Sequence, residues 1–437
     1  MSGNKNWLKW TIFFVCLAGV FILGMGIAMV LGRRAETRLA PVVSLDIPEN
    51  ETDPTVWGKV FPREYSRFLM TQDTTGSTKY GGPTPFSWLE RDTLLRFLWA
   101  GYPFSVEYNE DRGHAWTLVD LKKTARRDPA RGGKTQKGMC LTCKSSEVPG
   151  LMNEMGLDSF YSADLDDLLA KAKHPVSCSD CHDPKTMELR ITRPALSEAL
   201  LAMGKDTARL TRQELRSLVC AQCHSEYFFA GEPKRLIFPW KYGTGAEAMF
   251  KLYEEMGFSD WIHPTSGTPL IKVQHPDYEI FLSGPHAQAG LACADCHMPY
   301  ITEGGLKFTD HHIQSPLKDI SRACKPCHEG SEGEIKARVE IIQDRNHELL
   351  QTAELALTEA HRAIADAEVA GTTDEDLKGA RALLRKAQFL WDYVFSANSM
   401  GFHAPQEAAR ILGEAIDLAR QAQVSGLSAQ ARAKGGK

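Results

Sequence analysis

The sequence Cys178-Ser-Asp-Cys181-His182 is the first of four cysteine pairs that are each followed at once by histidine. The other three are Cys220-Ala-Gln-Cys223-His224, Cys293-Ala-Asp-Cys296-His297 and Cys324-Lys-Pro-Cys327-His328. A fifth pair precedes them and ends in lysine, Cys140-Leu-Thr-Cys143-Lys144. In Cys-x-x-Cys-His, the two thiols attach haem c and the histidine is an axial ligand of its iron. The spacing therefore predicts five covalently bound haems, one of them with an unusual ligand.

Two other interpretations of paired cysteines, structural zinc and a disulfide framework, are disfavoured. Histidine occupies 14 of 437 positions, so chance would place it after four of five pairs about five times in a million. Zinc sites do not require histidine at that adjacent position. Disulfides between cysteines this close along the chain would not link distant segments, so they could not stabilise a protein of this length.

Charge gives no indication of a nucleic-acid partner. The chain has 51 Lys and Arg residues against 55 Asp and Glu, and its formal net charge is -4. Any binding of an anion must therefore depend on local charge. With 43% hydrophobic residues, the chain can form one large or two medium domains, and five haems would occupy much of their interior.

Residues 10–31 form an uncharged apolar run, followed by Arg33 and Arg34. About 22 apolar residues can span the ~30 Å hydrocarbon core of a membrane, and they exceed the ~7–15 of a signal-peptide core. We therefore expect residues 1–34 to be an uncleaved membrane anchor. The alternative is a long cleavable signal, since small residues near Ala35 and Ala40 would permit processing. Either segment predicts that the rest lies on the periplasmic side of a bacterial inner membrane, anchored or soluble.

Composition divides the remaining chain into three parts. Residues 35–82 contain several prolines and a polar, turn-rich stretch, which predicts an extended linker leading into the compact part. Residues 83–331 carry the cysteine pairs among predicted short helices and loops, without the alternation that would predict a sizeable sheet. We therefore expect a mainly α multihaem fold, organised more by haem ligation than by secondary structure.

Residues 332–437 change to long runs of Ala, Leu, Glu, Arg and Lys with apolar residues three and four positions apart. This spacing predicts long helices over 335–370, 375–399 and 405–423. Gly371 suits the C-terminal cap of the first helix, and Thr372 with Glu375 has the spacing of a capping box for the second. The apolar stripes of these helices also suit a subunit interface.

Motifs around the cysteine pairs make the chain resemble a known family. They are Leu98-Trp99-Ala100-Gly101-Tyr102-Pro103-Phe104, Arg112-Gly113-His114, Cys223-His224-Ser225-Glu226-Tyr227, Lys272-Val273-Gln274-His275-Pro276 and His403-Ala404-Pro405. In order and spacing, over residues 99–412, the chain is similar to the pentahaem cytochrome c nitrite reductases. The resemblance implies six-electron reduction of nitrite to ammonium and a homodimer. It also implies an electron donor, either a membrane quinol dehydrogenase cytochrome or a soluble multihaem protein.

The resemblance further implies the ligands of each haem. Lys144 would bind one iron and leave its opposite face open for nitrite, whereas four histidine pairs would bind the other irons from both sides. The implied pairs are His182 with His311, His224 with His114, His297 with His403, and His328 with His286. His312 is a rival to its neighbour His311. We expect the remaining unassigned histidines to be structural: His174, His263, His347 and His361.

Three side chains would surround the open site in such an enzyme: Arg112, Tyr227 and His275. Positive charge and hydrogen bonds would hold an anion there, and Tyr227 and His275 would deliver protons. The resemblance also implies a calcium ion bound by oxygen ligands. Its ligands would be the side chains of Glu226 and Gln274 and the backbone carbonyls of Tyr227 and Lys272. Some relatives have arginine in place of Gln274 and lack the ion, so the glutamine favours calcium.

Two other functions stay open from the sequence. A multihaem electron conduit would have six-coordinate iron throughout, and Lys144 together with Arg112, Tyr227 and His275 argues against it. An enzyme that acts mainly on hydroxylamine or sulfite would need the same kind of pocket.

Overall fold

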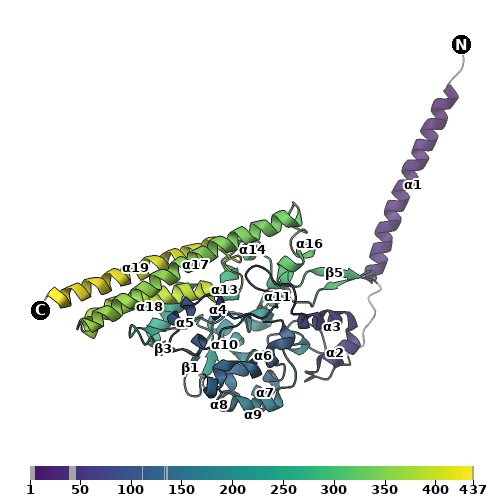
Figure 1. The fold of residues 1–437 in the computed structure, drawn as a ribbon. Coiled ribbons are helices and arrows are strands. Elements are labelled where there is room, and N and C mark those ends of the chain that lie inside the picture. Colours follow the sequence, from purple (N-terminus) through teal and green to yellow (C-terminus); the bar gives the residue numbers. More distant parts are fainter. Residues whose placement is uncertain (1–4, 39–45, 111, 132, 134–135, 436–437) are drawn as a thin grey trace.

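Helices dominate the structure, which is a computed structural model describing residues 5–38, 46–110, 112–131, 133 and 136–435. Figure 1 shows a body of short helices and loops, three long C-terminal helices along one side of it, and an N-terminal helix that projects away. The described strands form three separate antiparallel hairpins, β1–β2, β3–β4 and β5–β6. The predicted mainly α fold with little β structure is confirmed.

The elements of the body are short and follow one another closely. The α-helices are α2 (Pro54–Val60), α3 (Pro62–Leu69), α4 (Trp88–Arg91), α5 (Leu94–Leu98), α6 (Thr117–Lys123), α7 (Val148–Met155), α8 (Leu157–Ser162), α9 (Leu165–Lys171), α10 (Pro194–Ala202), α11 (Arg212–Ala221), α12 (Ala246–Met256), α13 (Asp277–Leu282), α14 (Pro285–Gln288), α15 (Cys293–His297) and α16 (Ile320–Ala323). The strands are β1 (Phe228–Ala230), β2 (Arg235–Ile237), β3 (Trp261–Ile262), β4 (Pro269–Leu270), β5 (Tyr300–Glu303) and β6 (Leu306–Thr309). Short 3-10 turns are η1 (Met70–Gln72), η2 (Pro103–Ser105), η3 (His114–Trp116), η4 (Ala125–Arg127), η5 (Pro129–Arg131), η6 (Gly138–Leu141), η7 (Cys178–Asp180), η8 (Thr207–Arg209) and η9 (Pro316–Lys318).

The N-terminal helix α1 (Lys5–Arg38) contains the predicted apolar segment. Its stretch Asn6–Met29 has a mean hydropathy of 2.6 and is long and apolar enough to cross a membrane. The side chains along this stretch are exposed, an arrangement that suits lipid contact better than water. Ala40, near the alternative processing site, lies outside the described residues.

The prediction of an extended linker was wrong for residues 54–72, which form α2, α3 and η1. Asp53 caps α2 by accepting a hydrogen bond from the Thr55 N–H at 2.8 Å, and Pro54 occupies the first helical turn. Trp57 is only 1% exposed, and its indole N–H donates to the Glu51 carbonyl at 3.0 Å. These helices therefore pack on the body. The boundaries at 35, 83 and 332 stay a prediction.

The three long helices are α17 (Glu332–Val369), α18 (Asp374–Phe395) and α19 (Pro405–Gly435). Gly371 has φ +93° and donates to the Glu368 carbonyl at 2.9 Å, which confirms it as the C-terminal cap of α17. The predicted capping box was displaced by one residue, because Thr373 pairs with Asp376. The N–H of Thr372 is instead bonded to the Ala367 carbonyl, at 3.1 Å, in the turn that ends α17.

Helices α17 and α19 approach closely because small side chains separate them. Alanines are buried along both, and a Cβ at Gly426 would lie 3.0 Å from the Ala363 carbonyl carbon. Helix α18 contacts the body through buried aromatic rings, with Trp391 6.0 Å from Trp99 between centroids. Helix α17 and the segment between α18 and α19 line part of the cavity that holds the candidate site, with Gln343 and His403 among the lining residues.

Candidate haem cavity and active site

The cysteine pairs lie on short helical turns, which bring the reactive side chains of each motif together. In three pairs the histidine N–H bonds the carbonyl of the first cysteine, at 2.9 Å for His182, 2.9 Å for His224 and 3.0 Å for His328. Residues three and four positions apart share one face of a helical turn, so both thiols and the imidazole of a motif face the same side. In the first pair along the chain, which ends in lysine, the Lys144 N–H instead bonds the carbonyl of Leu141, three residues back, at 2.9 Å.

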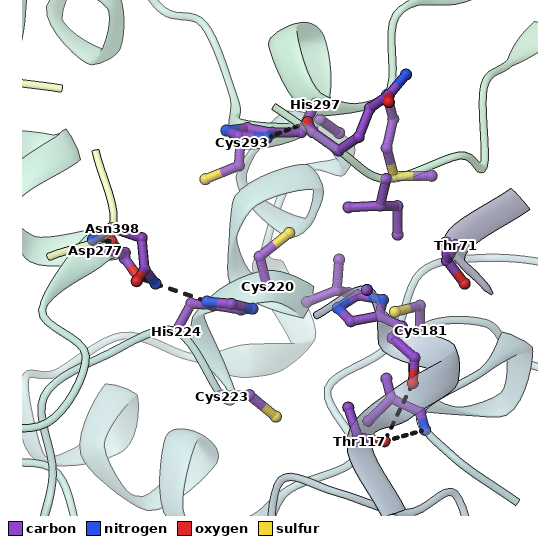
Figure 2. Close-up of a pocket in the computed structure, with 18 of the residues that line it drawn as sticks. Thr71, Thr117, Cys181, Cys220, Cys223, His224, Asp277, Cys293, His297 and Asn398 are labelled. Carbon is purple, nitrogen blue, oxygen red and sulfur yellow. Dashed lines mark hydrogen bonds and ion pairs between the residues drawn. The ribbon is translucent and has the colours of Figure 1, made fainter. Parts of the chain in front are cut away.

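All five cysteine pairs contribute to the lining of one cavity of about 1580 Å³. Figure 2 shows part of this cavity, with Cys181, Cys220, Cys223 and Cys293 on neighbouring segments. The ten cysteines of the pairs are unbridged. The thiols are therefore available for attachment of a group inside the cavity, as haem c requires.

The predicted histidine partners face one another in the structure. The ring centroids are 6.4 Å apart for His114 and His224, 6.2 Å for His182 and His311, 6.3 Å for His297 and His403, and 6.1 Å for His286 and His328. Metal–imidazole bonds are about 2.0–2.1 Å long, so one metal ion between two rings places their centroids about 6 Å apart. The four distances therefore fit haem iron bound from both sides. The ring that faces His182 belongs to His311, the residue the resemblance implied, and not to its neighbour His312.

Several histidine rings donate a hydrogen bond to a backbone carbonyl, and this leaves Nε2 available to bind a metal. A carbonyl only accepts, so a ring nitrogen bonded to one carries the proton and leaves Nε2 with its lone pair. Nδ1 donates in this way from His182 to Met187 at 2.9 Å, from His297 to Gln314 at 2.9 Å and from His311 to Thr309 at 2.8 Å. Burial lowers the pKa of His114 and of His403 to about 4, so both rings are neutral at pH 7. Neutral imidazole is the ligating form.

His224 is oriented by a carboxylate. Its Nδ1 lies 3.5 Å from Oδ2 of Asp277, and Figure 2 shows this contact on the side away from the third cysteine pair's thiols. Asn398 holds the carboxylate in place, because its backbone N–H donates to Oδ1 at 2.7 Å and its amide donates to Oδ2 at 2.8 Å. Asp277 also lies beside His275, since its N–H donates to the His275 carbonyl at 2.7 Å. Neither Asp277 nor Asn398 belongs to a motif in the sequence, so their contacts with this site were not predicted.

Arg112 lines the same cavity as Lys144 and is held by Asp120. The guanidinium donates from Nε to Asp120 Oδ2 at 3.0 Å and from Nη2 to Oδ1, a bidentate pair. It also stacks over the Trp116 ring, 3.7 Å from the ring centroid. Two contacts thus fix the orientation of one positive charge at the cavity wall. Asp120 is a further residue that the sequence analysis did not identify.

Tyr227 and His275 also line the cavity. Burial raises the pKa of Tyr227 well above its usual range, so the phenol keeps its proton at neutral pH. The ring of His275 lies 6.4 Å from that of His224. All four predicted active-site residues, Lys144, Arg112, Tyr227 and His275, therefore line this cavity.

The predicted calcium ligands lie together behind this wall. Glu226 is fully buried, and its two carboxylate oxygens accept from the Tyr253 hydroxyl at 2.9 Å and the Gln274 N–H at 2.6 Å. Both donors are neutral, and burial raises the pKa of Glu226 to about 8. A buried carboxylate of this kind fits a hard cation.

The other expected ligands also suit an oxygen-coordinated ion. The Gln274 amide reaches the Lys272 carbonyl, Nε2 to O, at 3.0 Å; half a turn of the amide would present Oε1 there. The Lys272 ammonium points elsewhere, to Asp392 Oδ1 and Ser396 Oγ at 2.8 Å each. It therefore does not neutralise Glu226 by direct contact. Among the described residues there is no group of three or more His, Cys, Asp or Glu side chains suited to a metal.

A helical body in which five cysteine pairs line one cavity and four pairs of histidine rings face one another defines a multihaem c-type cytochrome. Residues 53–436 match the cytochrome c552 family, and the chain belongs to this family.

Individual relatives are similar over most of their length. The cytochrome c-552 of Parabacteroides distasonis is 42% identical over 424 residues, which cover 96% of this chain and 86% of that protein. The cytochrome c-552 of Bacteroides thetaiotaomicron is 42% identical over 426 residues, with the same coverage of 96% and 86%. Among solved structures, the cytochrome c nitrite reductase from Desulfovibrio desulfuricans, whose catalytic subunit has two calcium sites, aligns with a TM-score of 0.82. It is 34% identical, and the alignment covers 88% of this chain and 87% of that chain.

Proposed function

We propose that this protein is an ammonia-forming cytochrome c nitrite reductase. The observation that carries the proposal is the position of Lys144, which replaces the attachment-motif histidine and lines the same cavity as Arg112, Tyr227 and His275. An electron-transfer haem needs no such set of polar side chains beside it. The likeness to the Desulfovibrio desulfuricans enzyme supports the same conclusion.

Five haems c would be attached through the ten paired cysteines, four with iron between the facing histidines and one held by Lys144 with an open face. When bound, they supply one-electron chemistry at iron, and Lys144 must bind as the neutral amine. The facing imidazoles would hold the other four haems. The open position is the place for a small anion.

Arg112 would bind the anionic substrate. Asp120 engages Nε and Nη2 of its guanidinium, and among the described residues Nη1 has no hydrogen-bond partner. This group can donate to a nitrite oxygen without a change in the orientation of the side chain. Because Asp120 and Trp116 fix the guanidinium beforehand, little reorganisation is needed as negative charge develops on the departing oxygen.

Tyr227 and His275 would move protons. Reduction of nitrite to ammonium consumes six electrons and eight protons and releases two water molecules, so proton supply matters at every stage. The phenol of Tyr227 stays protonated at neutral pH and can donate a hydrogen bond or a proton. The imidazole of His275, next to Asp277 in the chain fold, can take a proton from water and pass it on.

Calcium would act on this site through the backbone. We propose that Glu226, Gln274 and the carbonyls of Tyr227 and Lys272 bind one Ca²⁺. Tyr227 follows Glu226 directly, and His275 follows Gln274 directly. An ion that holds Glu226 and Gln274 together would therefore fix both proton-carrying side chains.

We propose that α1 anchors the enzyme on the periplasmic side of a bacterial inner membrane. Its apolar, exposed stretch Asn6–Met29 supports this. An anchor would keep the haems near a membrane quinol dehydrogenase cytochrome, with a soluble multihaem donor as the alternative. N-terminal sequencing of the mature protein tests it, since a cleaved signal would remove α1.

A homodimer through the long helices is proposed as well. Apolar side chains remain exposed on them, with Val369 90% and Val424 63% exposed. Light scattering on the purified protein tests it, and a monomeric mass at micromolar concentration would contradict it.

The activity is tested by a complete electron balance. The purified protein, with reduced viologen as donor, should convert nitrite to ammonium with six viologens oxidised per nitrite. Parallel assays with hydroxylamine and with sulfite measure the preference, and kcat/KM should be highest for nitrite. Viologen oxidation without ammonium, or no oxidation beyond electron uptake by the haems, would contradict the proposal.

A further inference from the structure

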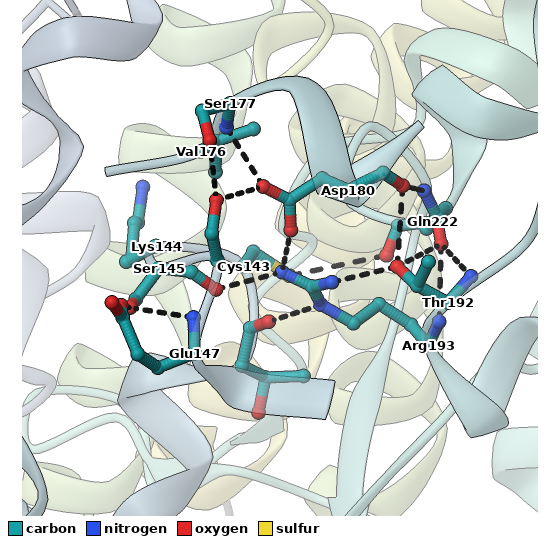
Figure 3. Close-up of polar contacts among 12 residues, drawn as sticks. Cys143, Lys144, Ser145, Glu147, Val176, Ser177, Asp180, Thr192, Arg193 and Gln222 are labelled. Carbon is teal, nitrogen blue, oxygen red and sulfur yellow. Dashed lines mark hydrogen bonds and ion pairs between the residues drawn. The ribbon is translucent and has the colours of Figure 1, made fainter. Parts of the chain in front are cut away.

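A single buried arginine, Arg193, forms hydrogen bonds with the backbone on both sides of Lys144 (Figure 3). Arg193 Nε donates to the Thr142 carbonyl at 2.9 Å, and Nη2 donates to the Ser145 carbonyl at 3.0 Å. These carbonyls stand on either side of Cys143 and Lys144. A third contact holds Lys144 itself, because the Thr117 hydroxyl donates to its carbonyl at 2.8 Å.

Arg193 also joins this loop to two other haem-attachment motifs. Its Nη2 donates to Oδ1 of Asp180 at 2.6 Å, and Asp180 lies inside the second cysteine pair. Its backbone N–H donates to Oε1 of Gln222 at 3.0 Å, and Gln222 lies inside the third. The Gln222 amide closes the network by donating to the Asp180 carbonyl at 3.0 Å. Arg193 therefore links three motifs, the first two through its guanidinium and the third through its backbone N–H.

The network is buried. The side chains of Arg193 and Asp180 are 2% and 4% exposed. The planar fork of an arginine can bond several acceptors in fixed directions, whereas a lysine ammonium cannot reproduce that arrangement. Since Arg193 contacts carbonyls on both sides of Lys144, a small shift of the guanidinium would displace the lysine backbone.

We propose that Arg193 is a positioning residue that sets the placement of the Lys144 amine relative to the open haem site. The inference rests on the proposed role of Lys144 as an iron ligand. Arg193 itself need not touch substrate. Its effect would pass through the Thr142 and Ser145 carbonyls, so that the bond between amine and iron has the right length and direction for turnover.

The chain offers a matched control. Arg216 is 5% exposed, and its Nη2 donates to Oδ1 of Asp295 at 2.6 Å. Asp295 occupies the same position in the fourth cysteine pair as Asp180 does in the second. Arg216 is therefore a second buried arginine paired with a motif aspartate, but it makes no hydrogen bond to the Lys144 loop within the described chain.

The test compares Arg193→Lys, Asp180→Asn and Arg216→Lys with the wild type in the full-length, haem-loaded protein. Haem content is measured by mass, the lysine-bound haem by electron paramagnetic resonance of the oxidised protein, and turnover as kcat and KM for nitrite. In Arg193→Lys we expect five haems, an altered signal from the lysine-bound haem, and kcat reduced about tenfold or more while KM changes little. Asp180→Asn should alter the same signal less, and Arg216→Lys should leave it unchanged.

Each outcome decides the matter. An unchanged signal in both Arg193→Lys and Asp180→Asn would overturn the proposal, as would an equal change in Arg216→Lys. Loss of haem from the first cysteine pair in both variants would also overturn it, because Arg193 would then be needed to build the loop. If wild-type protein forms no ammonium, the proposed function fails. The comparison of signals still tests the positioning role in that case.

Discussion

Oδ2 of Asp277 lies 3.5 Å from Nδ1 of His224, so a carboxylate contacts a ring that faces His114 across the haem cavity. The rings of His182 and His297 instead donate to backbone carbonyls. An anionic partner makes an imidazole a stronger electron donor than a neutral carbonyl does. The histidine of the third cysteine pair therefore has an anionic partner, whereas those of the second and fourth pairs have neutral ones.

Asp277→Asn is expected to raise the midpoint potential of the haem bound by His224. The loss of one negative charge disfavours ferric iron, and a shift of roughly 60 mV would correspond to a tenfold change in the one-electron equilibrium. A redox titration followed by electron paramagnetic resonance measures it. Asn398→Ala, which only loosens Asp277, should shift the potential less in the same direction. A lower or unchanged potential in Asp277→Asn would contradict this assignment.

Lys144→His is expected to retain all five haems, because the change restores the common attachment motif. Nitrite turnover should nevertheless fall, since imidazole replaces a primary amine as the axial ligand and changes the field at that iron. Haem content by mass and ammonium formation with reduced viologen check the two halves separately. Full turnover in the variant would show that the lysine is not required.

Arg112→Ala is expected to reduce kcat/KM for nitrite by about 10²–10³-fold while haem content stays the same. The reason is that the guanidinium of Arg112 is a fixed positive group at the cavity wall. Asp120→Asn should have a smaller effect on kcat/KM, because it only allows the arginine to reorient. Steady-state kinetics of both variants give the comparison. Loss of haem or unfolding in Arg112→Ala would make the arginine a structural residue.

Removal of calcium is expected to lower turnover without loss of haem. A chelator should release one ion per chain from the wild type, and added Ca²⁺ should restore activity, since the ion would orient Tyr227 and His275 through the backbone. Glu226→Gln should bind calcium much more weakly, with low activity that added ion improves little. A metal-free protein as active as the untreated one would contradict the predicted role.

The buried pair His263 and His361 is expected to make the protein less stable in acid. Their ring centroids are 4.0 Å apart, and His361 is also bonded to Ser266 at 2.8 Å and Gln388 at 2.7 Å. Burial, reinforced by His263, lowers the pKa of His361 to about 3. Between about pH 3 and pH 6.5 this ring is therefore neutral in the folded protein. In the unfolded chain, where the pKa of the ring is ~6.5, it is protonated over the same range.

Stability should thus fall as the pH drops from about 6.5 toward 3, because the unfolded state binds the additional proton. The contribution of His361 is at most about 5 kcal/mol, since its pKa falls from 6.5 to about 3 and one pKa unit is about 1.4 kcal/mol. Urea unfolding at pH 7 and pH 4.5, followed by circular dichroism, measures it. His361→Gln should lose less stability over this range than the wild type. An equal loss would assign the acid sensitivity to other groups.

Local patterns in the sequence were sufficient to predict the three long helices, but the predicted ends at 399 and 423 were wrong, because α18 ends at Phe395 and α19 continues to Gly435. The end of α17 and the start of α18 show the limit. Thr372 and Thr373 each have an acidic residue three positions later, and the capping box formed at Thr373 because the turn at Gly371 uses the N–H of Thr372. Which threonine forms the capping box depends on the hydrogen bonds at the end of the preceding helix. The spacing of residues in the sequence does not reveal those bonds.

Tertiary contacts account for what the sequence analysis missed. The Asp53–Pro54 signal of α2 was present, but the burial of Trp57 depends on the folded body. Asp277 and Arg193 are ordinary charged residues in the sequence, and their roles arise from contacts with distant segments. Asp120 pairs with Arg112, which lies only eight positions away, but nothing in the spacing marks the pair. Arg193 reaches Thr142 across 51 positions. The roles of the haem and calcium ligands stay predictions, although the rings assigned to each haem face one another.

The most direct test of the account is electron paramagnetic resonance of the oxidised, purified protein with and without nitrite, alongside a haem count and an ammonium assay on the same sample. We predict five haems per chain and a high-spin or coupled signal from one of them, which nitrite alters and which accompanies ammonium formation. Five low-spin signals that do not respond to nitrite would contradict the account and make the protein an electron conduit.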